Sequence, residues 1–291
     1  MDRNRKLGIG MVLLGASLWG SSSNCIEYLM HYQHWSWQTV LFARMVCTSV
    51  AFLAWCLFQK MDMLRPLRED PLLLLKFIVL GMYGMQVPFV RAIASSNAAT
   101  ATVLQYLMPA LLLGYYLLQE RRAPRKKEVA SVVLAIVGTG LIATQGKGAA
   151  LAISVDTLFW GIVSAFGMAW YTLYAAKLLR KYSCLLVLGW GSLGNALLLW
   201  VVNAPQFPAA PVTASTISAF GVLLILGTFV AYTVYLESTR YIPASETGAL
   251  AAFEPLSAYF FSVLFLGNHI GLAESLGALC IMTMVVILAR K

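Results

Sequence analysis

The sequence predicts an all-α polytopic membrane protein: ten transmembrane helices in two inverted five-helix repeats, with both termini in the cytoplasm. Hydrophobic residues make up 60% of the 291 residues and charged residues only 11%, whereas a soluble domain carries about 25% charged residues. Ten apolar segments are each long enough to cross a bilayer, which takes about 20 residues. Lys and Arg residues gather in alternate connections between them. This composition excludes a soluble enzyme, a coiled coil and a disordered chain.

The first apolar segment, residues 7–30, follows the basic sequence MDRNRK and resembles the start of a signal peptide. Its apolar stretch is too long for a signal peptide, and polar residues interrupt it where cleavage would be expected. We therefore expect a retained first span. The nine later spans are predicted at 36–58, 71–92, 97–118, 128–145, 155–177, 184–203, 214–237, 245–266 and 271–289.

The basic residues predict the orientation of these spans, because short cytoplasmic loops carry an excess of Lys and Arg. With the N-terminus inside, the external connections hold only Arg91 and Lys147, and Arg44 and Lys76 lie within spans. The distribution also explains the net charge of +9 without a nucleic-acid partner. The other 17 of the 21 basic residues fall inside: Arg3, Arg5, Lys6, Lys60, Arg65, Arg68, Arg121, Arg122, Arg125, Lys126, Lys127, Lys177, Arg180, Lys181, Arg240, Arg290 and Lys291.

Matching features in the two halves predict an internal repeat over residues 1–146 and 147–291. Trp19 and Trp170 lie in the middle of the first and sixth spans, and Pro109 and Pro255 lie deep in the fourth and ninth. Since each half has an odd number of spans, two homologous halves would have opposite orientations in the membrane.

These segments carry a family resemblance. The stretch from SSNAATATVLQYLMPA to ERRAPRKKEVASVVLAIVGTGLIA, and the stretch PASETGALAAFEPLSAYFFSVLFLG with LGALCIMTMVVILAR, resemble the EamA family of the drug/metabolite transporter superfamily. The resemblance implies an inverted-repeat transporter with a central cavity, often an exporter of metabolites or amino acids. One departure is that Asn268 follows Gly267 where the family often has an acidic residue, which weakens an acidic role at that external end.

Arg44 is the most informative single residue. It lies about eight residues from the outer end of the second span, which places it roughly 12 Å deep at 1.5 Å per residue. An Arg at the centre of a membrane helix costs about 2.5–3.5 kcal/mol, so we expect it to face a cavity or a partner. It would either attract a substrate carboxylate or hold a gate, or it would be a structural pin fixed by carbonyls and amides.

Glu254 is the natural counterpart of Arg44. It lies near the middle of the ninth span beside Pro255, which lacks an N–H and so frees the carbonyl one turn earlier. A carboxylate there could bind a substrate amine or a coupling proton. The alternatives are a structural ion pair with Arg44 and a protonated, hydrogen-bonded Glu.

Further polar and aromatic side chains within the spans are predicted to line the same cavity. A polar group at depth needs a partner, which a wet cavity or an ordinary interhelical hydrogen bond supplies. An aromatic ring can bind a ligand ammonium or simply pack between helices. The predicted substrate-binding residues besides Arg44 and Glu254 are Trp19, Asn24, Tyr83, Gln86, Gln105, Trp170, Tyr174 and Tyr232. Glu27, in the outer third of the first span, is a similar polar residue for which interhelical hydrogen bonding is favoured.

The sequence predicts no catalytic residue, no cofactor and no metal site. The five cysteines form no CxxC pair, and neither a phosphate-binding loop nor a zinc-binding motif is present. We therefore expect a secondary transporter in a bacterial-type plasma membrane, a monomer or weak dimer, that exports small amphipathic metabolites such as amino acids. Protons are a candidate coupling ion. The main alternative is a multidrug or weak-base exporter coupled to protons. An intramembrane enzyme and a scaffold that transports nothing are weaker alternatives.

Overall fold

A computed structural model describes residues 3–145, 152–206, 212–238, 240–242, 247, 250–269 and 271–289. All regular elements in these ranges are helices, as the hydropathy predicts. Eight helices are long and apolar enough to cross a bilayer, and Phe253–Leu266 and Leu272–Leu288 are shorter apolar helices. The chain is thus a multi-pass helical protein.

The helices follow the expected segments closely, although several spans consist of more than one element. The first half contains α1 (Arg3–His31), α2 (Trp37–Phe58), α3 (Arg65–Glu69), α4 (Pro71–Lys76), η1 (Phe77–Tyr83), α5 (Gly84–Ala94), α6 (Ala98–Gln105), α7 (Met108–Glu120) and α8 (Lys126–Thr144). The second contains α9 (Val155–Leu178), α10 (Cys184–Leu198), η2 (Leu199–Asn203), α11 (Ala214–Gly221), η3 (Val222–Val230), α12 (Ala231–Ser238), α14 (Phe253–Leu266) and α15 (Leu272–Ala289).

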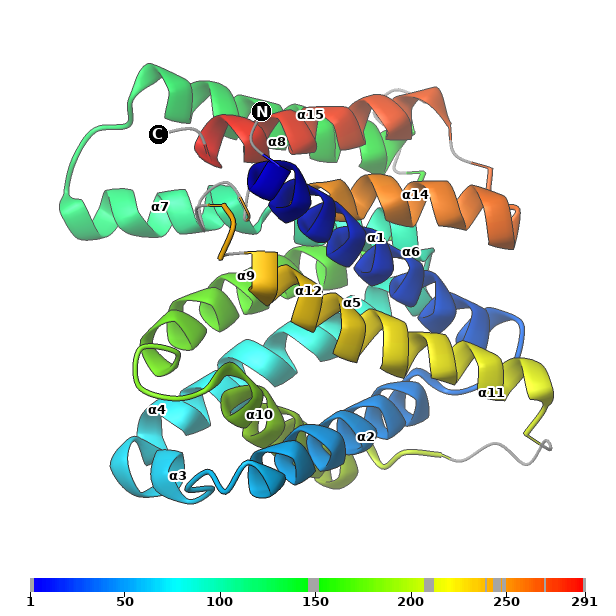
Figure 1. The fold of residues 1–291 in the computed structure, drawn as a ribbon. Helices are drawn as coiled ribbons and strands as arrows, with labels where there is room; N and C mark the ends of the chain where they lie inside the picture. Colours follow the sequence, from blue (N-terminus) through cyan, green and yellow to red (C-terminus); the bar gives the residue numbers. More distant parts are fainter. Residues whose placement is uncertain are drawn as a thin grey trace.

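The helices cross one another at various angles (Figure 1), and the main packing pairs join the two halves of the chain. Helix α2 packs on α10, and α8 packs on α15 at the opposite edge of the bundle. Helix α1 packs on η3, α12 and α14, while α9 packs on η1, α5 and α6. Exchanging each helix of the first half for the helix at the same place in the second leaves this set of pairs unchanged. The inverted repeat itself stays a prediction.

The loops that carry most of the basic residues lie at one end of the bundle (Figure 1). The connections after α2, α7 and α9 are there, together with the first turn of α1 and the last turn of α15. The connections from α1 to α2 and from α14 to α15 lie at the opposite end. We call these the basic end and the opposite end. The assignment of the basic end to the cytoplasm stays a prediction from the charges.

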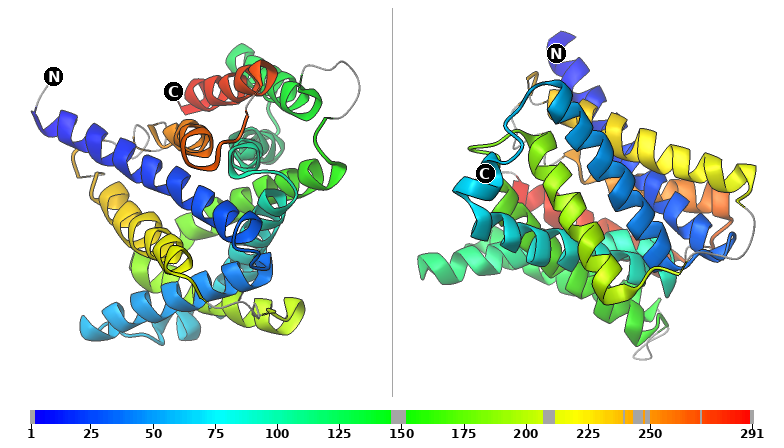
Figure 2. Two further views of the ribbon diagram at one scale, coloured as in Figure 1. Left: turned by 90° about the vertical axis from the view of Figure 1, so that its right-hand side faces the viewer. Right: turned by 90° about the horizontal axis from the view of Figure 1, so that it is seen from below.

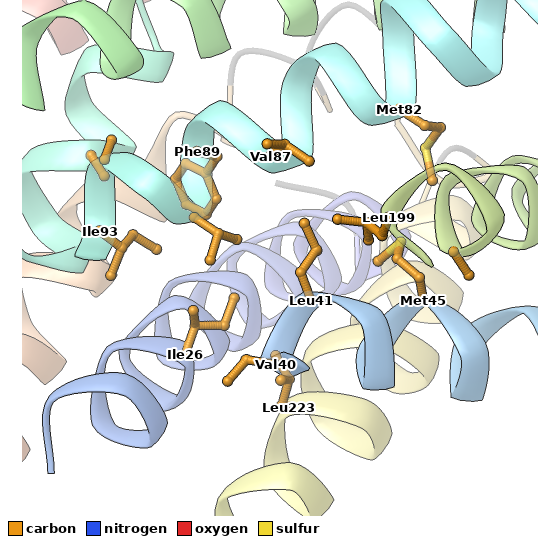
Figure 3. Packing of buried hydrophobic residues seen from close by; sticks show 14 of the residues in the cluster. Ile26, Val40, Leu41, Met45, Met82, Val87, Phe89, Ile93, Leu199 and Leu223 are labelled. Atoms are coloured by element: carbon orange, nitrogen blue, oxygen red, sulfur yellow. The ribbon is translucent and has the colours of Figure 1, made fainter. Parts of the chain in front are cut away.

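The larger apolar core lies between the two halves. In Figure 3, Ile26 of α1, Leu41 and Met45 of α2, Phe89 of α5 and Leu223 of η3 converge on one region. Small residues allow the closest approach of backbones. A side chain added at Gly167 of α9 would collide with the Gly84 carbonyl of α5, so this crossing requires glycine.

Two helical segments are broken near Pro109 and Pro255, the prolines that the sequence singles out. Helix α6 ends at Gln105 and α7 begins at Met108, beside Pro109. Helix α14 begins at Phe253, two residues before Pro255. In addition, η1 and η3 are π-helical, which is rare and is often found at functional sites. These irregular stretches belong to the segments Pro71–Ala94, Ala98–Glu120 and Ala214–Tyr235 and to the start of α14, which can be followed by their colours in Figure 2.

Candidate functional site

A small cavity lies at the centre of the bundle. It has a volume of about 20 Å³, which is room for about one water molecule. Its polar wall combines helices of both halves, and its apolar wall is formed by Met45, Phe52, Met82 and Leu188. The polar lining residues are Arg44 and Thr48 of α2, Gln86 of α5, Ser192 of α10, Thr228 of η3 and Tyr232 of α12.

Arg44 is the charged group of this central cavity. Only 8% of the residue is exposed, and its one hydrogen bond within the described residues joins Nη1 to Gln86 Oε1 at the long distance of 3.5 Å. The Nε atom of Arg44 and the Oγ1 atom of Thr48 are buried without a hydrogen-bonding partner. A buried charge is normally paired, because an unpaired one costs several kcal/mol. The geometry therefore leaves donors of Arg44 available to an acceptor in the cavity.

Aromatic rings connect this cavity to Glu254. The Trp19 ring of α1 contacts Tyr232 and Tyr235 of α12, with centroid distances of 5.1 Å and 4.9 Å. The Nε1 atom of Trp19 is a further buried donor without a partner. Tyr171 of α9 interacts with Tyr232 from the opposite side. These rings form an amphipathic wall with polar groups at its edge.

Glu254 lies at the break in the ninth span, where Tyr106 from the break in the fourth span meets it. The Tyr106 hydroxyl lies 2.9 Å from Glu254 Oε2 and 2.9 Å from the Ala251 carbonyl oxygen. Ala251 is four residues before Pro255, so its carbonyl is the one that the proline leaves without a helical N–H. The Glu254 backbone N–H also donates to this carbonyl, at 2.9 Å.

The two contacts of Tyr106 cannot both be donated by Tyr106, because a phenol carries a single proton. When Glu254 is ionised, the hydroxyl donates to the carboxylate. When Glu254 is protonated, it can donate to the phenol oxygen, and the hydroxyl is then free to bind the Ala251 carbonyl. The protonation of Glu254 thus decides which of the two groups at the helix break Tyr106 binds.

Arg44 and Glu254 attract each other through space but form no direct ion pair within the described residues. The Glu254 carboxylate binds the hydroxyl of Tyr106, the residue that follows α6, and Tyr235 of α12 interacts with it electrostatically. Of the alternatives that the sequence leaves open, a tight structural ion pair is therefore absent among the described residues. Tyr232 contacts the Trp19 ring and lines the cavity that holds Arg44, whereas Glu254 lies at the helix break beside Tyr106.

The remaining predicted residues lie outside the central cavity. Asn24 donates from Nδ2 to the carbonyls of Gly20 and Ala258, at 2.9 Å and 3.0 Å, and so holds α1 against α14. The Tyr83 hydroxyl donates to Asn203 Oδ1 at 2.7 Å and joins η1 to η2. Gln105 is buried at the end of α6, next to Tyr106, but does not line the cavity.

Trp170 and Tyr174 of α9 stack on each other, with ring centroids 5.7 Å apart, and Tyr174 is partly buried against the apolar core. Trp170 is 38% exposed and its other aromatic neighbour is Tyr115 of α7. One residue rotates an α-helix by about 100°, so Tyr171 points inward beside Tyr232 instead. A role for Trp170 and Tyr174 in binding stays a prediction without a place in this cavity.

Three polar residues that line the cavity, Thr48, Ser192 and Thr228, were not identified by the sequence analysis. Thr48 lies four residues after Arg44, and Thr228 lies four residues before Tyr232, so helical periodicity alone places each beside a predicted residue. Ser192 had no such signal. Asn195, one turn after Ser192, is fully buried, and both of its side-chain polar atoms lack a partner.

Hydrogen bonds between the two halves close both ends of the bundle. At the opposite end, Glu27 accepts from the Ala98 N–H and from Asn268 Nδ2, each at 2.7 Å. Glu27 therefore makes the interhelical hydrogen bonds that the sequence favours for it. Helix α1 therefore places the acidic side chain of Glu27 in contact with Asn268, the residue that follows Gly267.

At the basic end, Asp70 accepts from Lys181 Nζ at 2.9 Å and from the Tyr182 hydroxyl. These hydrogen bonds lower the pKa of Asp70, the one from Tyr182 more than the one from Lys181. Burial and the neighbouring carboxylates raise the pKa of Tyr182. This group of three residues ties the start of α4 to the connection between α9 and α10.

Within the described ranges, no group of three or more His, Cys, Asp or Glu residues could hold a metal ion.

Comparisons with known proteins connect this geometry to transport. The sequence profile of the EamA-like transporter family matches residues 6–144 and again residues 157–290. The chain is 35% identical to the "Uncharacterized inner membrane transporter YicL" of Salmonella typhimurium (strain LT2), over 99% of this chain and 97% of that protein. A solved structure described as "Crystal structure of protein" matches 98% of the chain with a TM-score of 0.60 and 17% identity, over 95% of its own length, which supports the fold alone.

Proposed function

Because the chain belongs to the EamA-like transporter family and is a multi-pass cell-membrane protein, we propose that it exports small amphipathic metabolites that carry a carboxylate, namely amino acids or related compounds. The observation that carries this proposal is Arg44, a buried cation with no carboxylate partner at the centre of the bundle. A substrate carboxylate in the central cavity would supply the missing acceptor.

The ammonium group of an amino acid would fit Glu254 and the aromatic rings beside it. An ammonium group can bind an ionised carboxylate such as Glu254 and the face of a Trp or Tyr ring. Trp19 lies between the two ends of this arrangement, in contact with Tyr232 of the cavity. The cavity of about 20 Å³ is too small for such a substrate, so the proposal requires the helices to move apart on one side when substrate enters.

The transport cycle that we propose is alternating access by two inverted repeats. Its support is the exchangeable set of helix pairs, the breaks beside Pro109 and Pro255, and the bonds between the halves at both ends, from Asn268 to Glu27 and from Lys181 to Asp70. Substrate sites of such transporters lie near the midplane at broken helices. Opening would release either the Glu27 contacts at one end or the Asp70 contacts at the other.

Proton coupling through Glu254 is part of the proposal. Protonation would move the Tyr106 hydroxyl from the carboxylate to the Ala251 carbonyl, and so link the two broken spans more directly. Loss of the negative charge would also remove the ammonium partner. Substrate amine and proton would therefore compete for Glu254, which is the requirement for exchange of one for the other.

Counterflow in proteoliposomes tests the proposal. Purified protein would be reconstituted with amino acids inside, and uptake of each radiolabelled amino acid would be compared with uptake of its decarboxylated amine. We expect exchange of the carboxylate-bearing compounds, a loss of at least about tenfold in Arg44→Gln, and partial recovery in Arg44→Lys, which keeps the charge but not the planar fork. Arg91→Gln is the matched control, since Arg91 packs on Trp160 away from the cavity.

A proton-coupled exporter of weak bases is the second candidate, favoured by the position of Glu254 beside the Trp19, Tyr232 and Tyr235 rings. In that case the amines would be exchanged and the amino acids would not. Arg44→Gln would then retain activity, whereas Glu254→Gln would lose it. Normal exchange of amino acids by Arg44→Gln would therefore contradict the carboxylate proposal.

A further inference from the structure

A second and much larger hollow lies away from the central cavity. It is a groove of about 890 Å³ between α7, α8 and the end of α15. Helix α7 has no buried residue along its whole length, whereas α8 and α15 pack so closely that a side chain at Gly138 would collide with Gly277. Figure 1 shows α7 standing apart from the α8 and α15 pair. The groove therefore lies between α7 on one side and the closely packed α8 and α15 on the other.

The walls of this groove are apolar and its rim is basic. Along α7 the wall includes Pro109, Leu113 and Tyr116, and on the other side it includes Val285 and Leu288 of α15. At the basic end of the bundle the groove meets the loop between α7 and α8. The charged residues of this rim are Glu120, Arg122, Arg125, Lys126, Lys127 and Glu128.

The rim keeps an excess of positive charge after its internal ion pairs are formed. Arg122 binds Glu120 and Glu128 at 2.6 Å and 2.7 Å, which satisfies both carboxylates. Arg125, Lys126 and Lys127 form no salt bridge within the described part of the chain and are exposed. Three cations thus remain at one end of an apolar groove, which is the charge distribution that complements an anionic headgroup joined to a hydrocarbon chain.

The length of the groove fits one leaflet of a bilayer. Its α7 wall runs from Met108 to Glu120, which at 1.5 Å per residue is about 18 Å. One leaflet contributes about half of the roughly 30 Å hydrocarbon core. A lipid with its phosphate at the basic rim would therefore reach the break between α6 and α7 with its acyl chain.

We propose that this groove is a binding site for an anionic phospholipid, with the phosphate held by Arg125, Lys126 and Lys127 and an acyl chain lying between α7 and α15. The bound lipid fills the space that α7 leaves open and holds that helix at a fixed distance from the α8 and α15 pair. Because α7 continues the span that carries Tyr106, the lipid also steadies the helix break beside the central site. This inference does not depend on which substrate the protein transports.

Lipid retention and thermal unfolding of the delipidated full-length protein test the proposal. Phosphatidylglycerol and phosphatidylcholine with identical acyl chains are the probes, and glycerol phosphate is the headgroup without chains. We expect one phosphatidylglycerol per chain in native mass spectra and a higher unfolding temperature with that lipid than with phosphatidylcholine. We expect no stabilisation by glycerol phosphate, because the site needs the acyl chain.

Two variants separate the site from the general charge of the protein. The triple substitution Arg125→Gln, Lys126→Gln and Lys127→Gln should weaken phosphatidylglycerol binding by about tenfold or more, since each basic residue contributes to headgroup attraction. Its control is Lys60→Gln, Arg68→Gln and Arg180→Gln, which removes three basic residues from other loops. Leu113→Trp should fill the groove and displace the lipid without changing any charge.

Four results would overturn the proposal. Equal binding of the two lipids would show that the headgroup is not recognised. Equal loss in the control triple variant would show attraction to the overall charge alone. Full retention by Leu113→Trp, in protein whose unfolding temperature without lipid is unchanged, would place the lipid outside the groove. A stable dimer whose mass is lost in Leu113→Trp would instead assign the groove to a second copy of the chain.

Discussion

Removing the Tyr106 hydroxyl tests the proton-dependent contact at the two helix breaks. In Tyr106→Phe the Ala251 carbonyl keeps its bond from the Glu254 N–H at 2.9 Å, so the loss falls mainly on the Glu254 carboxyl group. A hydrogen bond to a charged group contributes about 1.5–3 kcal/mol, and one between neutral groups about 0.5–1.5 kcal/mol. We therefore expect Tyr106→Phe to cost about 1 kcal/mol more when Glu254 is ionised than when it is protonated.

The assay is denaturant unfolding of wild type and Tyr106→Phe in detergent, over a series of pH values from 5 to 9. The difference in unfolding free energy should shrink toward acid, because protonation removes the charged acceptor. Tyr83→Phe is the matched control: its hydroxyl binds the neutral Asn203 amide at 2.7 Å, so its cost should be independent of pH. In Glu254→Gln, the cost of Tyr106→Phe should be small at every pH, which gives a coupling of about 0.5–3 kcal/mol.

A cost of Tyr106→Phe that is constant over the whole pH series would refute this reasoning, because it would mean that Glu254 does not change protonation state. A cost that persists unchanged in the Glu254→Gln background would place the lost interaction at Ala251 instead.

Three further predictions concern the ends and the packing of the bundle. Single cysteines introduced in the loop 121–125 should be protected from a membrane-impermeant reagent in intact cells, and a cysteine at position 97 should react; the reverse pattern would invert the predicted orientation. Asp70→Asn should lower the unfolding temperature at pH 7, because a carboxylate with a lowered pKa stabilises the fold above its ordinary pKa of about 3.9, and the wild-type advantage should shrink as the pH falls below that value and through the lowered pKa. An advantage of unchanged size throughout the acid range would show that the shape of the Asp70 side chain, and not its charge, stabilises the contact. Gly167→Ala should destabilise the protein by on the order of 1–3 kcal/mol, since the new methyl group meets the Gly84 backbone. Gly114→Ala meets nothing within 4 Å and should be tolerated, and equal unfolding temperatures of the two variants would contradict the close α5–α9 crossing.

The helical class and the span positions could be predicted because apolar length is a property of the sequence alone. Arg44, Gln86 and Tyr232 could be predicted as neighbours of a central cavity because a polar group at depth requires one. The same rule gave no means of distinguishing Asn24, whose Nδ2 atom binds carbonyls of α1 and α14, from a residue that lines the cavity. A packing partner can bind a polar group at depth as well as a cavity can.

The aromatic residues show a different limit. Trp170 and Tyr171 are adjacent in a span that is apolar on all sides, so periodicity does not say which of them faces inward. In a soluble protein the polar face of a helix would decide this, but lipid and core are both apolar. Here Tyr171 is the residue that faces inward, because it interacts with Tyr232, which lies in another span. The contact of Tyr106 with Glu254 likewise joins two breaks that are 148 residues apart in the chain.

The π-helical stretches η1 and η3 determine the direction in which Gln86 and Tyr232 point. A turn with i to i+5 hydrogen bonds holds about one residue more than an ordinary turn, and each extra residue changes the direction of everything after it by about 100°. Gln86 follows η1, and Tyr232 follows η3. Deleting one residue from either stretch would restore a regular helix with nearly unchanged ends, yet it would turn Gln86 or Tyr232 toward a different neighbour. The composition of the cavity wall thus depends on residue count as well as on residue type, and alignments of these two spans should treat single-residue gaps there as changes of the cavity wall.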